Sequence, residues 1–142
     1  MNKLWILSLV LVSLIGCSKK EEIVLAKYDY ADVADQIICW KDVLSRDNEH
    51  YYAYIFSKTC GHCNEIKQTV LTYALEHIDS FYFVEFNNQV PVINDVSSTI
   101  GKSNIEEIGI VGTPTLFIVD NHVLMENIPG SNRIVETLTN DY

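Results

Sequence analysis

The chain has few positively charged residues for its size. Its 142 residues include 10 Lys and Arg against 19 Asp and Glu, which gives a net charge of −9 at pH 7. Binding to nucleic-acid phosphates depends on cations, so this deficit argues against a nucleic-acid partner and gives no attraction to anionic lipid headgroups. Internal repeats, low-complexity tracts and a second domain boundary are also lacking. We therefore expect a single domain.

The sequence also lacks the ligands of a typical metal site. Zinc takes four ligands, but the chain has one Cys-x-x-Cys and neither a second such pair nor a Cys-x-x-His. A copper(I) carrier that uses Cys60, His62 and Cys63 is the weakest functional alternative, because 2 methionines offer no further soft ligand set. We expect no bound metal and no cofactor.

The N-terminal hydrophobic run is too short to span a membrane. It extends from Leu4 to Ile15 and follows the positively charged Lys3, a pattern typical of an export signal. Residues 14–17, Leu-Ile-Gly-Cys, resemble a bacterial lipobox. The resemblance implies that Cys17 receives a diacylglycerol and becomes the mature N-terminus. The alternative is an ordinary signal peptide followed by a chance cysteine.

This N-terminus predicts the organisation of the chain: a signal peptide over 1–16, a lipidated tether over 17–28 and the folded domain over 29–142. Cleavage would leave 126 residues with 9 basic and 19 acidic side chains, a net charge of −10. Acyl chains on Cys17 would hold the domain at a membrane outside the cytoplasm. Ser18 after this cysteine points to the outer membrane, where the organism has one. Such a compartment is oxidising, and disulfide chemistry is useful there.

Hydrophobic periodicity predicts an α/β domain. Apolar residues spaced by three and four predict an amphipathic helix over 29–46. Aromatic-rich strands over 51–56 and 81–86, joined by a helix over 60–77, form a parallel crossover unit. A long loop with a short helix near 95–100 follows.

The C-terminal third predicts an antiparallel hairpin between two helices. We expect Asn104 to cap a brief helix over 105–108. Strands over 115–119 and 123–128 flank a turn at 120–122. A last helix, capped by Ser131 or Asn132, begins after Pro129-Gly130.

The most informative segment is Cys60-Gly61-His62-Cys63, which follows a predicted strand at the start of a helix. Two thiols at this spacing lie one turn apart and can form a disulfide. The first lies at the positive end of the helix, where unpaired amides and the macrodipole favour a thiolate. Because the thiolate is the species that attacks disulfides, the placement indicates redox exchange.

A second motif, Val111-Gly112-Thr113-Pro114-Thr115, enters the predicted hairpin. With the Cys-Gly-His-Cys segment and the element order, it makes residues 29–142 resemble the thioredoxin-fold thiol–disulfide oxidoreductases. The resemblance implies a central mixed four-stranded sheet flanked by helices. The Cys-Gly-His-Cys segment itself is similar to the active site of protein disulfide isomerases.

The resemblance also implies roles for individual residues. Cys60 is the expected nucleophile, Gly61 lets a substrate chain approach, His62 stabilises the Cys60 thiolate, and Cys63 resolves the mixed disulfide. The alternatives are a structural disulfide and a solvated histidine.

The second motif supplies the expected substrate-binding residues. Thr113-Pro114 is implied to be a cis peptide whose preceding backbone pairs with substrate. Pro114 could instead simply start an edge strand.

The sequence departs from the family at two positions. Tyr54 stands where thioredoxins carry a buried acid that moves protons to and from the resolving thiol, and Thr59 stands where tryptophan is often found. We hypothesise that Glu85 lies beneath Cys63 and takes over proton transfer. The alternative is a solvated Glu85 at a strand end. Cys39 is expected to be a small buried hydrophobe. The alternative is that it forms a regulatory or intermolecular disulfide.

Together these features predict a lipid-anchored, monomeric thiol–disulfide oxidoreductase that acts on the thiols and disulfides of exported proteins. His62 and Thr113 favour an oxidase or isomerase over a reductase, which would need an unidentified membrane redox partner. The alternative is a non-catalytic accessory protein of the same fold that binds exported peptides.

Overall fold

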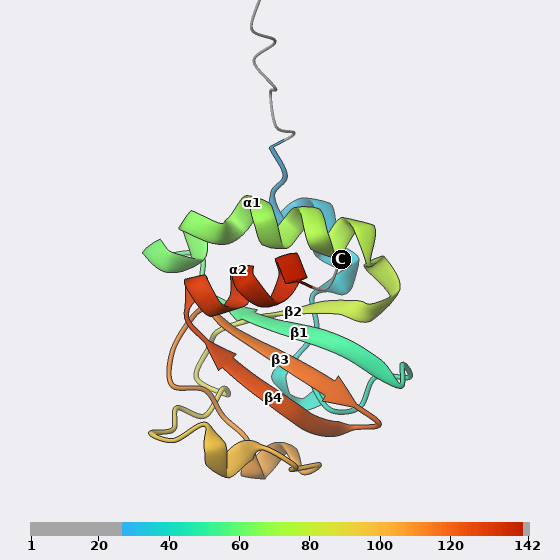
Figure 1. Ribbon diagram of the computed structural model, residues 1–142, viewed down its shortest axis with the longest axis vertical. Helices are drawn as coiled ribbons and strands as arrows, with labels where there is room; N and C mark the ends of the chain where they lie inside the picture. The colour runs from blue at the N-terminus through green and yellow to red at the C-terminus, as the bar shows by residue number, and fades with distance from the viewer. Residues whose placement is uncertain (1–26, 141–142) are drawn as a thin grey trace, which may run out of the picture.

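The computed structural model describes residues 27–140, which fold around one four-stranded sheet. In spatial order the strands are β2 (Phe81–Glu85), β1 (His50–Phe56), β3 (Thr115–Asp120) and β4 (Val123–Pro129). Strand β1 pairs in parallel with β2 and antiparallel with β3, and β3 pairs antiparallel with β4 (Figure 1). The predicted mixed sheet is confirmed, with each strand end within one residue of its predicted position.

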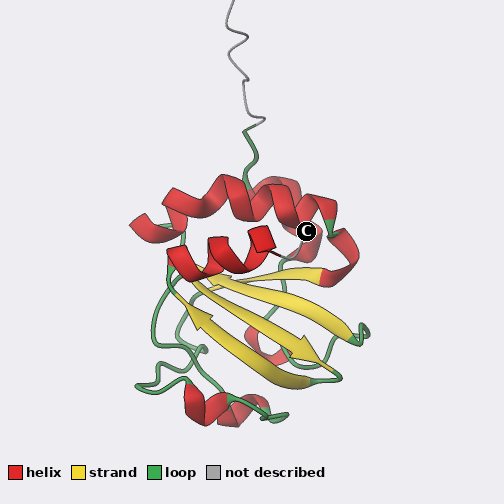
Figure 2. Cartoon of the chain, viewed as in Figure 1, coloured by secondary structure: helices red, strands yellow, loops and turns green. Residues whose placement is uncertain are grey.

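Helices α1 (Gly61–Glu76) and α2 (Ser131–Asn140) lie on the same face of the sheet (Figure 2). Residues 40–44 and the long connection between β2 and β3 cover the other face. Strand β1 is buried on both sides because its side chains alternate between two cores. Those facing the helices are Tyr52, Tyr54 and Phe56, and those facing away are Tyr51, Ala53 and Ile55.

The prediction of one continuous helix over 29–46 is wrong, because the chain is extended in the middle of this segment. Two short 3₁₀ helices, η1 (Tyr30–Gln36) and η2 (Trp40–Asp42), occupy this segment. Between them Ile37 forms a parallel bridge with Phe83, and the Ile38 N–H donates to the Phe83 carbonyl at 2.8 Å. Pairing with the outer edge of β2 satisfies backbone groups there and so outweighs the helical pattern.

Cys39 lies in this break, and the prediction that it is buried is wrong. Its side chain is exposed and its thiol is free. The adjacent Trp40 is buried instead, with its ring 6.0 Å from that of Phe117. Because the chain is extended at Cys39, neighbouring side chains point in opposite directions, and only one of the two can face the core.

The β2–β3 connection contains two single-turn helices, η4 (Ser97–Thr99) and η5 (Ile105–Glu107). A further turn, η3 (Ile78–Ser80), joins α1 to β2. The Asn104 side chain accepts a hydrogen bond from the Glu106 N–H at 3.0 Å, so the predicted cap is confirmed. Residues 111–114 lead from this connection into β3 and bring the Thr113 carbonyl oxygen to the Cys60 sulfur at the start of α1.

The predicted signal peptide, Cys17 and most of the 17–28 tether lie outside the described residues. Within residues 27–140, no helix combines the length and hydropathy needed to cross a bilayer.

Candidate functional site

The site is built where β1 ends and α1 begins. Cys60 is the N-terminal capping residue of α1, and its sulfur accepts a hydrogen bond from the Cys63 N–H at 3.2 Å. Cys60 is partly exposed, whereas Cys63, one turn further along, is 1% exposed. Both are free thiols. The structure therefore brings together one reachable sulfur and one buried sulfur, as the spacing predicts.

The two thiols have opposite electrostatic environments. Burial by itself would raise the pKa of Cys60, but hydrogen bonds from the Cys63 thiol and the Thr113 side chain outweigh it. The backbone N–H groups of Cys63 and His62 add to the effect, so the Cys60 pKa lies below its ordinary value. Among these two sulfurs, Cys60 is thus the one that ionises first.

Burial raises the pKa of Cys63 to about 11, and the hydrogen bond to Cys60 acts in the same direction. A thiol with this pKa stays protonated at neutral pH. Cys63 is therefore inert until a partner favours its ionised form.

The second motif, residues 111–115, lies against Cys60. The Thr113–Pro114 peptide is cis, as the resemblance implies, and the Thr113 carbonyl oxygen lies 3.4 Å from the Cys60 sulfur. The Pro114 carbonyl accepts a hydrogen bond from the Gly130 N–H at 3.0 Å. These contacts bring three segments together at one point: residues 60–63, residues 113–114 and the start of α2.

His62 lies at the site, but its ring does not contact the Cys60 sulfur. Its Nδ1 lies 3.2 Å from Glu65 Oε2, and its side chain is 74% exposed. The backbone N–H, and not the imidazole, is the part of His62 that acts on Cys60. The position of the ring fits the solvated alternative. A Cβ at Gly61 would meet nothing within 4 Å, so the surface at Gly61 is open.

Glu85 is placed away from the position that we hypothesised beneath Cys63. It is the last residue of β2, its side chain is 44% exposed, and Oε2 lies 2.9 Å from Lys58 Nζ. A charged group at a strand end with a lysine beside it has no reason to enter the core. The solvated alternative therefore describes Glu85.

Two tyrosines occupy the buried side of the cysteines. Tyr54 is fully buried and Tyr30 is 8% exposed, and both share one hydrophobic core with Cys63. Burial raises the pKa of each phenol, and the Cys63 thiol is the side chain that raises it most. Tyr54 was identified from the sequence as a departure from the family. Tyr30 was missed, because it lies 30 residues from Cys60 on a segment predicted as an ordinary amphipathic helix.

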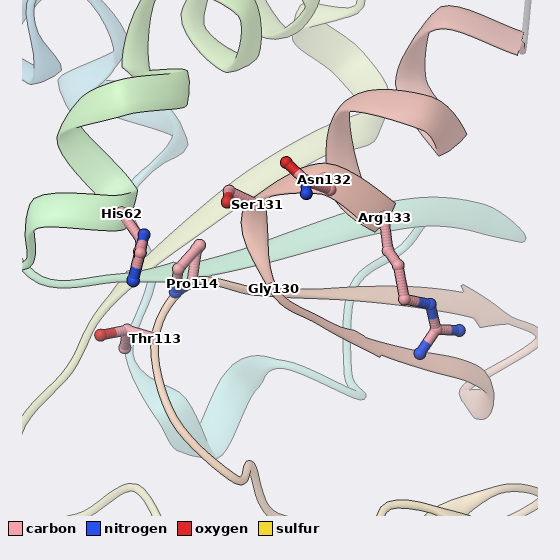
Figure 3. A pocket seen from close by; sticks show the side chains of 7 residues that line it. All are labelled: His62, Thr113, Pro114, Gly130, Ser131, Asn132 and Arg133. Atoms are coloured by element: carbon pink, nitrogen blue, oxygen red, sulfur yellow. The ribbon is translucent and has the colours of Figure 1, made fainter.

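A pocket of about 240 Å³ opens beside Pro114 (Figure 3). His62 and Thr113 lie at one end of it, and Arg133 of α2 extends at the other. No acidic side chain lines it, although the protein carries a net charge of −9. Gly130, Ser131 and Asn132 complete the lining. Sequence reasoning missed this contribution of α2, because it depends on the pairing of β3 with β4.

Nowhere in residues 27–140 do three His, Cys, Asp or Glu side chains gather closely enough to hold a metal ion.

Comparison with solved structures identifies the fold. A thioredoxin from Plasmodium falciparum matches with a TM-score of 0.50 and 19% sequence identity, over 75% of this chain and 98% of that chain. A chain in the complex of ferredoxin:thioredoxin reductase with thioredoxin f2 matches with a TM-score of 0.50 and 17% identity, over 75% of this chain and 91% of that chain. No family model and no curated protein matches the sequence. The chain thus has the thioredoxin fold.

Proposed function

We propose that the protein is a thiol–disulfide oxidoreductase that exchanges disulfides with exported proteins through Cys60 and Cys63. The observation that carries this function is the position of the Cys60 sulfur. It caps a helix N-terminus, its pKa is lowered, and it lies 3.4 Å from a backbone carbonyl at which a substrate chain can pair.

The exchange takes two steps. The Cys60 thiolate attacks one sulfur of a client disulfide, so a Cys60–client bond forms and the first client sulfur leaves as a thiolate. The Cys63 sulfur, having lost its proton, then attacks the Cys60 sulfur. The Cys60–Cys63 bond forms, and the second client sulfur leaves and takes up a proton. The client disulfide is reduced to two thiols while the enzyme dithiol is oxidised, and the reverse sequence oxidises a client.

The client binds beside Pro114. Its backbone pairs with that of Thr113 in the manner of an added strand, which places its cysteine at Cys60 and tolerates many sequences. The neighbouring side chain of the client enters the pocket. Since Arg133 is the cation there and no acid lines the pocket, a client carboxylate next to the cysteine is favoured.

The direction of exchange follows from the stability of the two redox forms. The hydrogen bonds that lower the Cys60 pKa stabilise the reduced enzyme, which makes its disulfide more oxidising. An oxidase or isomerase is therefore favoured over a reductase. A reduction potential well above that of thioredoxin supports this direction, and one near that of thioredoxin indicates a reductase.

The working place is outside the cytoplasm, at a membrane to which lipid on Cys17 anchors the domain. Support comes from the hydrophobic run, the lipobox-like segment and the polar tether that follows it. Incorporation of a labelled fatty acid into the wild-type chain, and its loss in Cys17→Ser, tests this anchor.

The function is tested by trapping. A Cys63→Ala variant expressed in cells keeps the nucleophile but cannot resolve the mixed disulfide, so it accumulates covalent complexes with exported proteins that a reductant releases. The matched control is the Cys60→Ala/Cys63→Ala double variant, which forms none. Absence of complexes from both variants contradicts exchange and leaves the accessory binding protein.

A further inference from the structure

Tyr54 lies at the centre of the molecule, in the middle of the central strand β1. Its neighbours across the sheet are Phe83 on β2 and Leu116 on β3. The alternation along β1 points its side chain toward α1, into the core that contains Cys63. Its exposed fraction is 0%.

The Tyr54 hydroxyl makes no hydrogen bond that meets ordinary geometric criteria within residues 27–140. The rings packed around it belong to Phe56, with centroids 6.2 Å away, and Phe83, at 5.8 Å, and neither offers a polar atom. A buried hydroxyl without a partner costs free energy, and phenylalanine would fill the same space without that cost. Such a group in a tightly packed core calls for a functional explanation.

The polar group that faces this hydroxyl is the Cys63 thiol. Cys63 lies in the same buried core as Tyr54, and of all side chains it raises the pKa of the Tyr54 phenol most. The other titratable groups that face the pair are Tyr30 on η1 and Cys60 at the start of α1. Burial raises the pKa of Tyr54, so the phenol keeps its proton and acts as a donor.

We propose that the Tyr54 hydroxyl donates a hydrogen bond to the Cys63 sulfur as that sulfur ionises to resolve the mixed disulfide. This role rests on the exchange function proposed above. The Cys63 thiol loses its proton, its sulfur attacks Cys60, and the client sulfur leaves and is protonated. Tyr54 keeps its own proton throughout and is neither oxidised nor reduced.

Burial makes ionisation of Cys63 unfavourable, and a hydrogen bond from Tyr54 would offset part of that cost. A buried thiol with a pKa of about 11 ionises rarely at neutral pH, and a hydrogen bond to the charged form is among the stronger ones in proteins. Glu85, at the surface beside Lys58, is not placed to supply it. Within the part of the chain that the structure describes, the Tyr54 hydroxyl has no partner while Cys63 is a thiol. It therefore gains one when Cys63 ionises.

The test uses the full-length chain with Cys17→Ser and Cys39→Ser, reduced and mixed rapidly with a disulfide peptide whose two thiols are distinguishable on release. Release of the first thiol measures attack by Cys60, and release of the second measures resolution by Cys63. Tyr54→Phe removes one hydroxyl and keeps the ring. Tyr51→Phe is the matched control, because Tyr51 is equally buried on β1 but its hydroxyl donates to the Val43 carbonyl on the opposite face.

We expect Tyr54→Phe to release the first thiol at the wild-type rate and the second about tenfold more slowly. The pH midpoint of the second release should move upward, because the Cys63 thiolate loses a donor. Tyr51→Phe should change neither the second release nor its midpoint. An unchanged second release in Tyr54→Phe, or an equal slowing in Tyr51→Phe, overturns the role of Tyr54 alone. A parent chain that releases neither thiol overturns the exchange function together with it.

Discussion

The Cys60 sulfur lies 3.4 Å from the Thr113 carbonyl oxygen, although 53 residues separate the two in the chain. The contact joins the helix start that activates the thiol to the loop at which a client strand can pair. Because α2 begins beside Pro114, the same point also borders a pocket with one cation. The activated thiol and the proposed client site therefore share a single corner of the sheet.

We expect Glu85→Gln to leave the pH profile of both thiol releases unchanged. The side chain is 44% exposed and paired with Lys58, and an exposed ion pair contributes about 0.2–1 kcal/mol to stability. Urea unfolding of the variant should therefore show a loss of no more than about 1 kcal/mol. A shift of the second-release midpoint as large as that of Tyr54→Phe would return proton transfer to Glu85.

Arg133→Glu should reverse the preference for client charge. Two disulfide peptides that differ only in a Glu or Lys beside the cysteine provide the comparison. An exposed charge pair contributes about 0.2–1 kcal/mol, so we expect the wild-type protein to exchange up to about fivefold faster with the Glu peptide at low salt.

The matched control for this prediction is Lys41→Glu, which makes the same charge change on η2, at the opposite face of the sheet. It should keep the wild-type preference. If Arg133→Glu and Lys41→Glu show the same preference between the Glu and Lys peptides, then Arg133 does not select clients by charge.

Gly109→Ala should destabilise the fold. An added Cβ would lie 2.7 Å from the Pro91 carbonyl oxygen and 2.8 Å from Ile93 Cγ2, and overpacking of this kind costs about 1–3 kcal/mol. The Gly109 carbonyl also accepts a hydrogen bond from buried Asn127 at 2.9 Å, so a backbone shift would disturb the attachment of the β2–β3 connection to β4.

Gly112→Ala is the control for this steric effect. A Cβ at Gly112 would meet nothing within 4 Å, and we expect a change in unfolding free energy of about 0.5 kcal/mol or less. Equal losses in the two variants, measured by urea unfolding, would contradict the close approach at Gly109.

The sequence predicts this sheet well because its signals are local. Aromatic runs define β1 and β2, and the turn residues at 120–122 define the β3–β4 hairpin, in which Asn121 and His122 adopt positive φ. The helical pattern over 29–46 misleads, because pairing of Ile37 with Phe83 is a long-range contact that no local pattern encodes. The exposure of Cys39 follows from that same pairing.

The residues of the candidate site also differ in whether local sequence motifs predict them. Cys60, Cys63, Thr113 and Pro114 are predictable, since short motifs carry them. The ring of His62 is misassigned because spacing does not indicate which way a side chain points, and it turns to Glu65. Arg133 and Tyr30 join the site through sheet pairing and core packing alone.

The ionisation of the Cys60 sulfur is tested most directly by alkylating the reduced protein with iodoacetamide over a range of pH. Mass spectrometry then measures modification of each cysteine separately, with a short unstructured cysteine peptide in the same solution as the reference. We predict that Cys60 reaches half of its maximal rate at a lower pH than the thiol of the reference peptide, and that Cys63 lags behind Cys60, in keeping with its pKa of about 11. A Cys60 that titrates together with the reference thiol or above it would contradict the lowered pKa of Cys60.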